Sequence, residues 1–146
     1  MDPGPLVAGI PAGILQPVLG RADWWSCNLR EATLLTGVGQ PAEAARQLRL
    51  RMPRASIMVR TGAAGCVLAT PDGSLTEIPA PRVDAVDTTG AGDAHAGVFL
   101  AALADGLPPA AAAARANAAA AWSTTRTGPA TAPGRDELDA FLRPRD

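Results

Sequence analysis

The sequence contains no lysine and no tyrosine, and all 13 of its basic residues are arginine. Without lysine, a Walker-type phosphate loop and a lysine Schiff base are both excluded. The 13 basic side chains nearly balance 14 acidic ones, so nothing indicates binding to nucleic acid or to a membrane surface. The single histidine and the two isolated cysteines, Cys27 and Cys66, lack the spacing of a zinc site. We therefore expect reduced, structural thiols in a cytoplasmic protein.

Long hydrophobic runs are also missing. The apolar stretch 6–19 has no positively charged start and contains two prolines and two glycines, which argues against a signal peptide or a membrane helix. Alanine supplies 32 of the 146 residues and much of the 47% apolar content. The apolar fraction thus overstates the core volume, and tight helix packing is favoured within one domain.

Strands and helices are expected to alternate. The expected strands cover residues 22–27, 56–60, 66–69 and 75–78, the last two forming a hairpin across a Pro-Asp-Gly turn. The expected helices cover residues 28–36, 42–51, 92–104, 108–123 and 136–142, whereas 1–19 holds helix only in pieces because Pro11 and Pro17 interrupt it. The helix at 92–104 is apolar nearly all round and should be buried. An extended segment leads to residue 87, and the pattern predicts a mainly parallel sheet between helical layers.

The segment Asp-Thr-Thr-Gly-Ala-Gly-Asp at residues 87–93 is the candidate site. Glycines let the backbone turn tightly, and the N–H groups at the start of the following helix can hold phosphate oxygens. The carboxylate of Asp93 would repel a phosphate, so it suggests a base that takes a proton from an attacking hydroxyl. The alternative is a plain turn in which Asp93 favours the helix dipole.

These seven residues, followed by a small apolar helix, resemble the second signature of the ribokinase-like carbohydrate kinases, the phosphofructokinase B-type family. Segments 28–37, 59–65 and 116–128 resemble further elements of that family in the right order. The resemblance implies a three-layer α/β/α, Rossmann-like sheet, mainly parallel with a β-hairpin. Residues 1–146 would be its carboxy-terminal, nucleotide-binding and catalytic-base portion. The double-glycine sugar motif and lid strands have no counterpart, so the fold would be incomplete at its amino-terminal side.

The resemblance also implies a role for each matching residue. Asp93 is the base, and the N–H groups of Gly90, Ala91 and Gly92 form the anion hole around the terminal phosphate of ATP. The implied nucleotide contacts are Asn28, Arg60, Thr61, Gly62, Ala63, Ala64, Gly65, Gly92 and Asn117. Glu31 acts through water on Mg2+, and a monovalent cation, K+ in most relatives, is bound by Asp87, Thr89, Ser123, Arg126 and Gly128. The family often has threonine where Arg60 stands.

Several of these residues have a simpler interpretation. Glu31 could be a solvated acid on a helix face, and Asn28 could be a helix cap, a role that can coexist with phosphate binding. Asn117 could simply face water from an alanine helix. His95 is expected to pack or to lie on the substrate side rather than to take part in catalysis.

The function implied by the resemblance is ATP-dependent phosphoryl transfer to a sugar hydroxyl, as in a ribokinase or fructokinase. Two alternatives remain: a non-catalytic, nucleotide-binding remnant of such a kinase, and a nucleoside kinase of the same superfamily. The expected partners are a small sugar substrate and either a second copy of the chain or a missing amino-terminal half, with no nucleic acid and no membrane.

Overall fold

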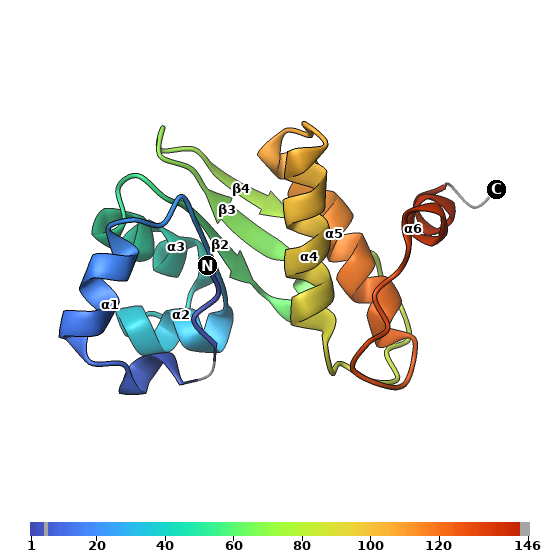
Figure 1. Ribbon diagram of the computed structural model, residues 1–146, viewed down its shortest axis with the longest axis horizontal. Coiled ribbons are helices and arrows are strands. Elements are labelled where there is room, and N and C mark those ends of the chain that lie inside the picture. The colour runs from blue at the N-terminus through green and yellow to red at the C-terminus, as the bar shows by residue number, and fades with distance from the viewer. Residues whose placement is uncertain (5, 144–146) are drawn as a thin grey trace. The chain divides into compact units, whose positions relative to one another are not determined.

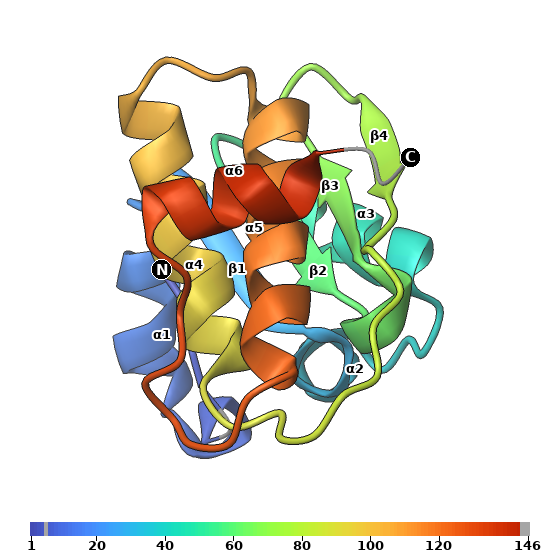
Figure 2. The same cartoon turned by 90° about the vertical axis from the view of Figure 1, so that its right-hand side faces the viewer.

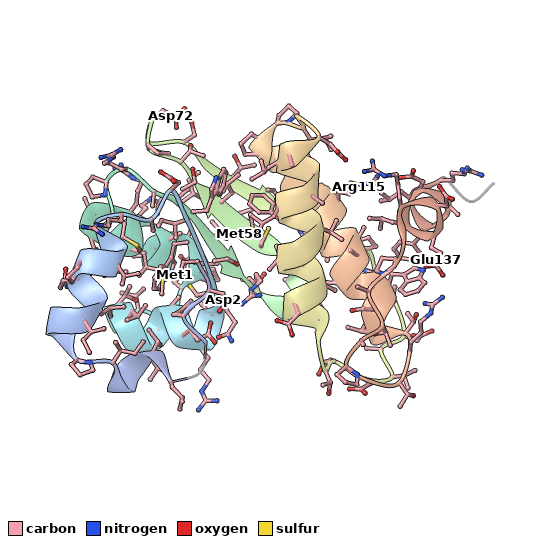
Figure 3. The ribbon with its side chains drawn as sticks, in the orientation of Figure 1. Met1, Asp2, Met58, Asp72, Arg115 and Glu137 are labelled. Atoms are coloured by element: carbon pink, nitrogen blue, oxygen red, sulfur yellow. The ribbon has the colours of Figure 1, made fainter. Side chains whose placement is uncertain are left out.

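A four-stranded sheet in the order β1-β2-β3-β4 lies in the first part of this computed structural model, which describes residues 1–4 and 6–143 (Figure 1). Strands β1 (Trp24–Asn28) and β2 (Ser56–Arg60) are parallel. Strand β3 (Cys66–Ala69) is antiparallel to β2 and to β4 (Leu75–Ile78). The predicted hairpin is confirmed, and Asp72 marks its turn (Figure 3). The described sheet is mixed, with one parallel and two antiparallel pairs, so it is less parallel than the sequence pattern predicted, because the hairpin supplies half of its strands.

Helices α2 (Leu29–Thr36) and α3 (Pro41–Arg51) pack on this sheet and complete one compact unit, Met1–Ile78. Its core is formed by fully buried residues of the helices and strands; examples are Trp25, Ala32, Leu48, Ile57 and Val59. The unit also contains α1 (Ala12–Leu19) and short 3-10 helices at Val7–Gly9 and Gly62–Ala64.

The interruption expected at Pro17 is not observed. Pro17 lies inside α1, which continues to Leu19, while Pro11 is its N-cap. A proline at this position removes the bond that its own nitrogen would donate to the carbonyl one turn earlier, and its ring crowds that carbonyl. In an eight-residue helix this loss leaves the other turns intact, so the sequence rule overstated the break.

The second compact unit, Pro79–Asp146, is helical. After an extended segment without helix or strand at 79–90, α4 (Ala91–Ala104) packs along α5 (Pro109–Thr124), and α6 (Arg135–Leu142) contacts α5 (Figure 2). Alanines of α5 such as Ala112, Ala113 and Ala116 are fully buried, because small side chains let two helices approach closely. Over the residues described, every helix is too short or too polar to cross a bilayer.

One face of α4 departs from the expectation that this helix is buried all round. Phe99 and Ala102 are buried, but the Leu100 side chain is 59% exposed. Beyond Gly92 at its start, the exposed positions of α4 follow helical spacing along one stripe: Asp93, Gly97, Leu100, Ala101 and Ala104. An apolar helix is buried all round only when it has neighbours on every side, and the described residues leave this stripe without a cover.

Candidate functional site

The start of α4 is shaped by Gly90, the N-cap residue, which has a φ of +79°. A Cβ placed on Gly90 would lie 2.2 Å from the carbonyl oxygen of Pro129. Only glycine fits here, because the backbone is in the left-handed conformation and the Pro129 carbonyl leaves no room for a side chain. The first helical hydrogen bond of α4 runs from Ala94 N–H to the Gly90 carbonyl at 2.9 Å, and the Ala91 N–H donates to the Thr88 carbonyl at 3.2 Å.

Asp93 lies in the first turn of α4 with an exposed side chain. This position agrees with the structural interpretation, in which the negative carboxylate interacts favourably with the positive end of the helix dipole. It also leaves the carboxylate accessible to a ligand, as a proton acceptor requires. The structure therefore accommodates both interpretations of Asp93, and its role as a base stays a prediction.

Asp87 ties together the loops that flank the two long helices. Its Oδ1 accepts the Thr89 N–H and its Oδ2 accepts the Gly128 N–H, each at 2.9 Å. These hydrogen bonds, that from Gly128 first, lower the pKa of Asp87 from its ordinary value because they stabilise the charged carboxylate. Asp87 thus fixes the segment before α4 to the loop after α5.

The expected cation ligands lie in this same loop region, and oxygens of three of them, Asp87, Ser123 and Gly128, already accept hydrogen bonds. The Ser123 carbonyl accepts the Arg126 N–H at 3.2 Å and the Thr131 hydroxyl at 3.1 Å. A carbonyl has two lone pairs, so Ser123 would have to give up one bond to coordinate a cation. The guanidinium of Arg126 lies over the Trp122 ring, 3.1 Å from its centroid. The K+ site stays a prediction.

Asn117 is 3% exposed, so the interpretation that it faces water is wrong. Its Oδ1 lies 3.1 Å from His95 Nε2, and its Nδ2 donates to the Pro79 carbonyl at 3.3 Å. His95 is also buried and stacks on Phe99 with 6.5 Å between ring centroids, which confirms its packing role. Asn117 therefore joins α5 to the first turns of α4, and its nucleotide contact stays a prediction.

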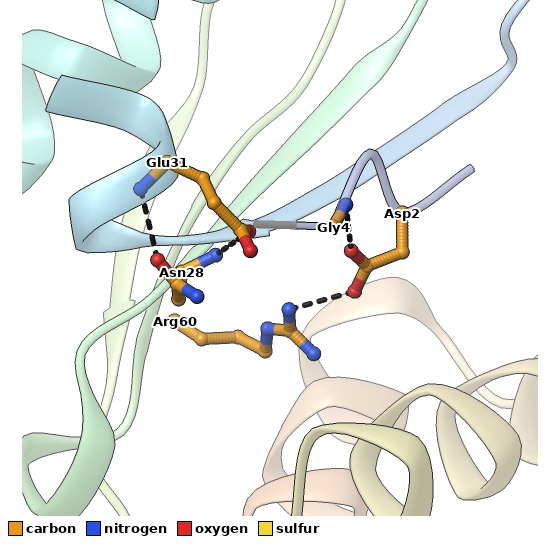
Figure 4. Close-up of polar contacts among 5 residues, drawn as sticks. All are labelled: Asp2, Gly4, Asn28, Glu31 and Arg60. Atoms are coloured by element: carbon orange, nitrogen blue, oxygen red, sulfur yellow. Dashed lines mark hydrogen bonds and ion pairs between the residues drawn. The ribbon is translucent and has the colours of Figure 1, made fainter. Parts of the chain in front are cut away.

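The Asn28–Glu31 element forms a reciprocal capping box at the start of α2 (Figure 4). The Glu31 N–H donates to Asn28 Oδ1, and the Asn28 N–H donates to Glu31 Oε2, each at 2.9 Å. The cap role of Asn28 is confirmed. Glu31 is 3% exposed, so the interpretation as a solvated acid is wrong. Its other oxygen, Oε1, makes no hydrogen bond within the described residues.

Arg60 ends β2, directly opposite Asn28 in the parallel register. Its Nη2 donates to Asp2 Oδ2 at 2.7 Å. The turn that follows closes with the Thr61 N–H bonded to the Gly65 carbonyl at 2.8 Å and encloses the 3-10 helix Gly62–Ala64. Sequence reasoning missed the ion pair because its partners are 58 positions apart and no local pattern links them.

Comparison with known proteins assigns the chain to a family. A model of the pfkB family carbohydrate kinases matches residues 9–135. The uncharacterized sugar kinase YegV of Escherichia coli is 34% identical over 142 residues, which cover 94% of this chain and 44% of that protein. The crystal structure of ribokinase from Thermotoga maritima superposes with a TM-score of 0.84 at 32% identity and covers 97% of this chain and 47% of that one.

A third comparison is with aminoimidazole riboside kinase from Salmonella enterica, solved with aminoimidazole riboside and an ATP analog. Its TM-score is 0.78 at 32% identity, and the match covers 89% of this chain and 45% of that one. The chain thus spans less than half the length of each of these three proteins. The predicted ribokinase-like fold is confirmed, and the chain belongs to the pfkB family of carbohydrate kinases.

Proposed function

We propose that this chain is the nucleotide-binding, base-carrying part of an ATP-dependent kinase that phosphorylates a hydroxyl of a small sugar. The observation that carries the proposal is the start of α4, where an exposed Asp93 follows a glycine turn packed too closely for any other residue at Gly90. The family match supports phosphoryl transfer as the reaction. Asp93 would orient the acceptor hydroxyl and accept its proton as the oxygen attacks phosphorus.

Backbone amides would stabilise the transferred phosphoryl group. The N–H groups of Gly90, Ala91 and Gly92 lie at the N-terminus of α4, where the helix dipole favours negative charge. Each well-placed donor of this kind contributes about 3 kcal/mol to the transition state. The Ala91 N–H donates to Thr88 at 3.2 Å, a long bond that a charged phosphate oxygen would readily replace.

Glu31 is the residue that fits a role next to magnesium. Mg2+ neutralises charge on the phosphates and keeps several of its own waters, so one carboxylate acting through water is sufficient. The Glu31 carboxylate is buried and held by the Asn28 N–H through Oε2. This capping bond fixes its orientation, and Oε1 remains as the oxygen that could accept from a magnesium-bound water.

The acceptor could be a free sugar or the ribose of a nucleoside. The relatives include a ribokinase and an aminoimidazole riboside kinase, which support both kinds of acceptor. A different class of function is a nucleotide-binding module without turnover.

We further propose that the remaining part of a kinase domain covers the exposed α4 stripe. Sedimentation of the chain and of Leu100→Asp tests the occupant: a monomer supports this proposal, and a dimer that Leu100→Asp dissociates would show that a second copy covers the stripe.

The decisive experiment compares ATP consumption and ATP binding by wild type, Asp93→Asn and Asp84→Asn, with a panel of sugars and nucleosides. Asp84 is an exposed carboxylate of the same unit and serves as a charge-matched control. Acceptor-dependent turnover that is lost only in Asp93→Asn, with ATP binding retained, supports the kinase. Binding without turnover in all three proteins supports the non-catalytic module. Equal turnover by wild type and Asp93→Asn removes Asp93 from the mechanism.

A further inference from the structure

The guanidinium of Arg60 is held at the end of β2 by a carboxylate from the first residues of the chain (Figure 4). Arg60 Nη2 lies 2.7 Å from Asp2 Oδ2, and the Arg60 side chain is 13% exposed. The other oxygen of Asp2, Oδ1, accepts the Gly4 N–H at 3.0 Å. Both oxygens of one carboxylate are therefore engaged, and the orientation of a long, flexible side chain is restricted.

Asp2 is in turn placed by the sheet. The neighbouring Met1 bonds to Trp24 and Ser26 of β1 through its amino and carbonyl groups. The strands β1 and β2 are paired so that their last residues, Asn28 and Arg60, lie opposite each other. The cation is thus fixed relative to the Asn28 cap by backbone pairing on one side and by an ion pair on the other.

Charged groups of both signs lie near this point. Burial first, and then the negative charges of Glu31 and Asp2, raise the pKa of the Cys27 thiol in β1, whereas the positive charge of Arg60 lowers it. A polyphosphate that approached the Asn28 cap would be repelled by the two carboxylates and attracted by the guanidinium of Arg60.

We propose that Asp2 is a positioning residue, which holds the Arg60 guanidinium so that it can make its implied nucleotide contact with a phosphate oxygen of a nucleoside triphosphate. The inference rests on the proposed function and adds a residue, Asp2, to its site. Ligands of α/β sheets bind beyond the carboxyl ends of parallel strands, where Arg60 stands. A planar, permanently charged fork of N–H donors suits phosphate. The adjacent Gly62 has a φ of +65° and open space at its Cβ position.

The test is calorimetric titration of the chain with ATP, inorganic tripolyphosphate and adenosine, without magnesium. Arg60→Gln is expected to weaken binding of ATP and tripolyphosphate about tenfold, which is the effect of losing one hydrogen bond to a charged group, and to leave adenosine binding unchanged. Arg60→Lys should recover part of the loss because it restores the charge without the fork. Arg54→Gln, at an exposed arginine of the same unit, should bind all three ligands as wild type does.

The positioning role of Asp2 has its own readout. Asp2→Asn keeps an oxygen for the Gly4 N–H but loses the ion pair, so it should weaken tripolyphosphate binding although it removes a repelling charge. Asp2→Glu should restore part of that binding. Asp23→Asn, an exposed position with the same change of charge, should not weaken it. In the Arg60→Gln background, Asp2→Asn should cause no further loss, because Asp2 acts through Arg60.

The outcomes separate this inference from the proposed function. If wild type and Arg60→Gln bind ATP and tripolyphosphate equally, the inference is overturned and the proposed nucleotide site stands. If Asp2→Asn strengthens tripolyphosphate binding, Asp2 only repels phosphate and its positioning role is overturned. If wild type binds neither ATP nor tripolyphosphate, both proposals fall. A thermal unfolding transition like that of wild type, measured for each variant, shows that the changes act on binding and not on folding.

Discussion

Replacing Gly90 by alanine tests the close packing at the start of α4. The substitution meets two separate obstacles: Gly90 has a φ of +79°, and the added Cβ would lie 2.2 Å from the Pro129 carbonyl oxygen. The left-handed conformation costs about 1–2 kcal/mol for a residue with a Cβ. The steric overlap adds about 1–3 kcal/mol, because the neighbouring backbone must move. Gly90→Ala should therefore lower the free energy of unfolding by about 2–5 kcal/mol.

Two other glycines separate these effects. Gly37 ends α2 with a φ of +75° and has no atom within 4 Å of its Cβ position. Gly37→Ala should thus cost only the conformational term, about 1–2 kcal/mol. Gly97 lies inside α4 without a positive φ and with equally open space. Gly97→Ala should stabilise the chain by about 0.5–1 kcal/mol, since alanine loses less entropy in a helix.

Urea titration of the full chain, followed by circular dichroism, measures all three variants on one scale. The expected order of stability is Gly97→Ala above wild type, then Gly37→Ala, then Gly90→Ala. If Gly90→Ala is no less stable than Gly37→Ala, the contact with Pro129 imposes no constraint and the reasoning about the helix start is wrong. ATP binding by the folded fraction of Gly90→Ala should also be weaker, because the amides proposed to hold phosphate shift with residue 90.

Three further predictions concern local contacts. Asn28→Ala should lower the free energy of unfolding by about 1 kcal/mol, whereas Asn28→Ser should retain most of it; equal urea midpoints for the two variants would contradict the cap. The pKa of Asp87 is lowered by the Gly128 and Thr89 N–H groups, so its contribution to stability is complete above the unfolded pKa of about 3.9 and is lost as the pH falls through the lower folded value. Wild type should accordingly lose stability faster than Asp87→Asn on acidification from about pH 5 to pH 2, and parallel profiles would exclude this contribution. Burial raises the pKa of Cys27 to about 12, so iodoacetamide at about pH 8 should alkylate it only after unfolding; fast labelling of the native chain, detected by mass spectrometry, would show that the thiol is accessible.

The secondary structure was predictable because it depends on signals within a few residues. Turn residues predicted the hairpin of β3 and β4, and prolines predicted the starts of α3 and α5. The boundary of β1 was less certain: the strand begins at Trp24, two residues later than expected. Ends of elements depend on pairing with distant strands, which composition alone does not encode.

The polar contacts of the candidate site were only partly predictable. The Asn28–Glu31 spacing is local and encodes the capping box. The burial of Asn117 was missed, although a polar residue in an alanine helix and a lone histidine in an apolar helix were both visible in the sequence. Two such polar residues can be buried when their side chains form a hydrogen bond with each other. The hydrogen bond between Asn117 and His95 joins positions that are 22 residues apart. That partnership requires the packing of α4 on α5, which no local rule supplies.

The exposed stripe of α4 bears directly on catalysis. If Asp93 accepts the proton of an alcohol, water must be kept from the phosphoryl group, since it would otherwise compete as the acceptor. Among the residues that the structure describes, none covers the stripe that runs from Asp93 through Leu100 to Ala104, so the proposed base and these apolar side chains are both exposed. The composition of α4, apolar nearly all round, fits a helix that becomes fully buried in a larger domain. Turnover by the isolated chain should therefore be slow, and part of the ATP should be hydrolysed without transfer to the acceptor. A segment that buries Leu100 should raise the rate of phosphoryl transfer to the acceptor and lower the rate of ATP hydrolysis.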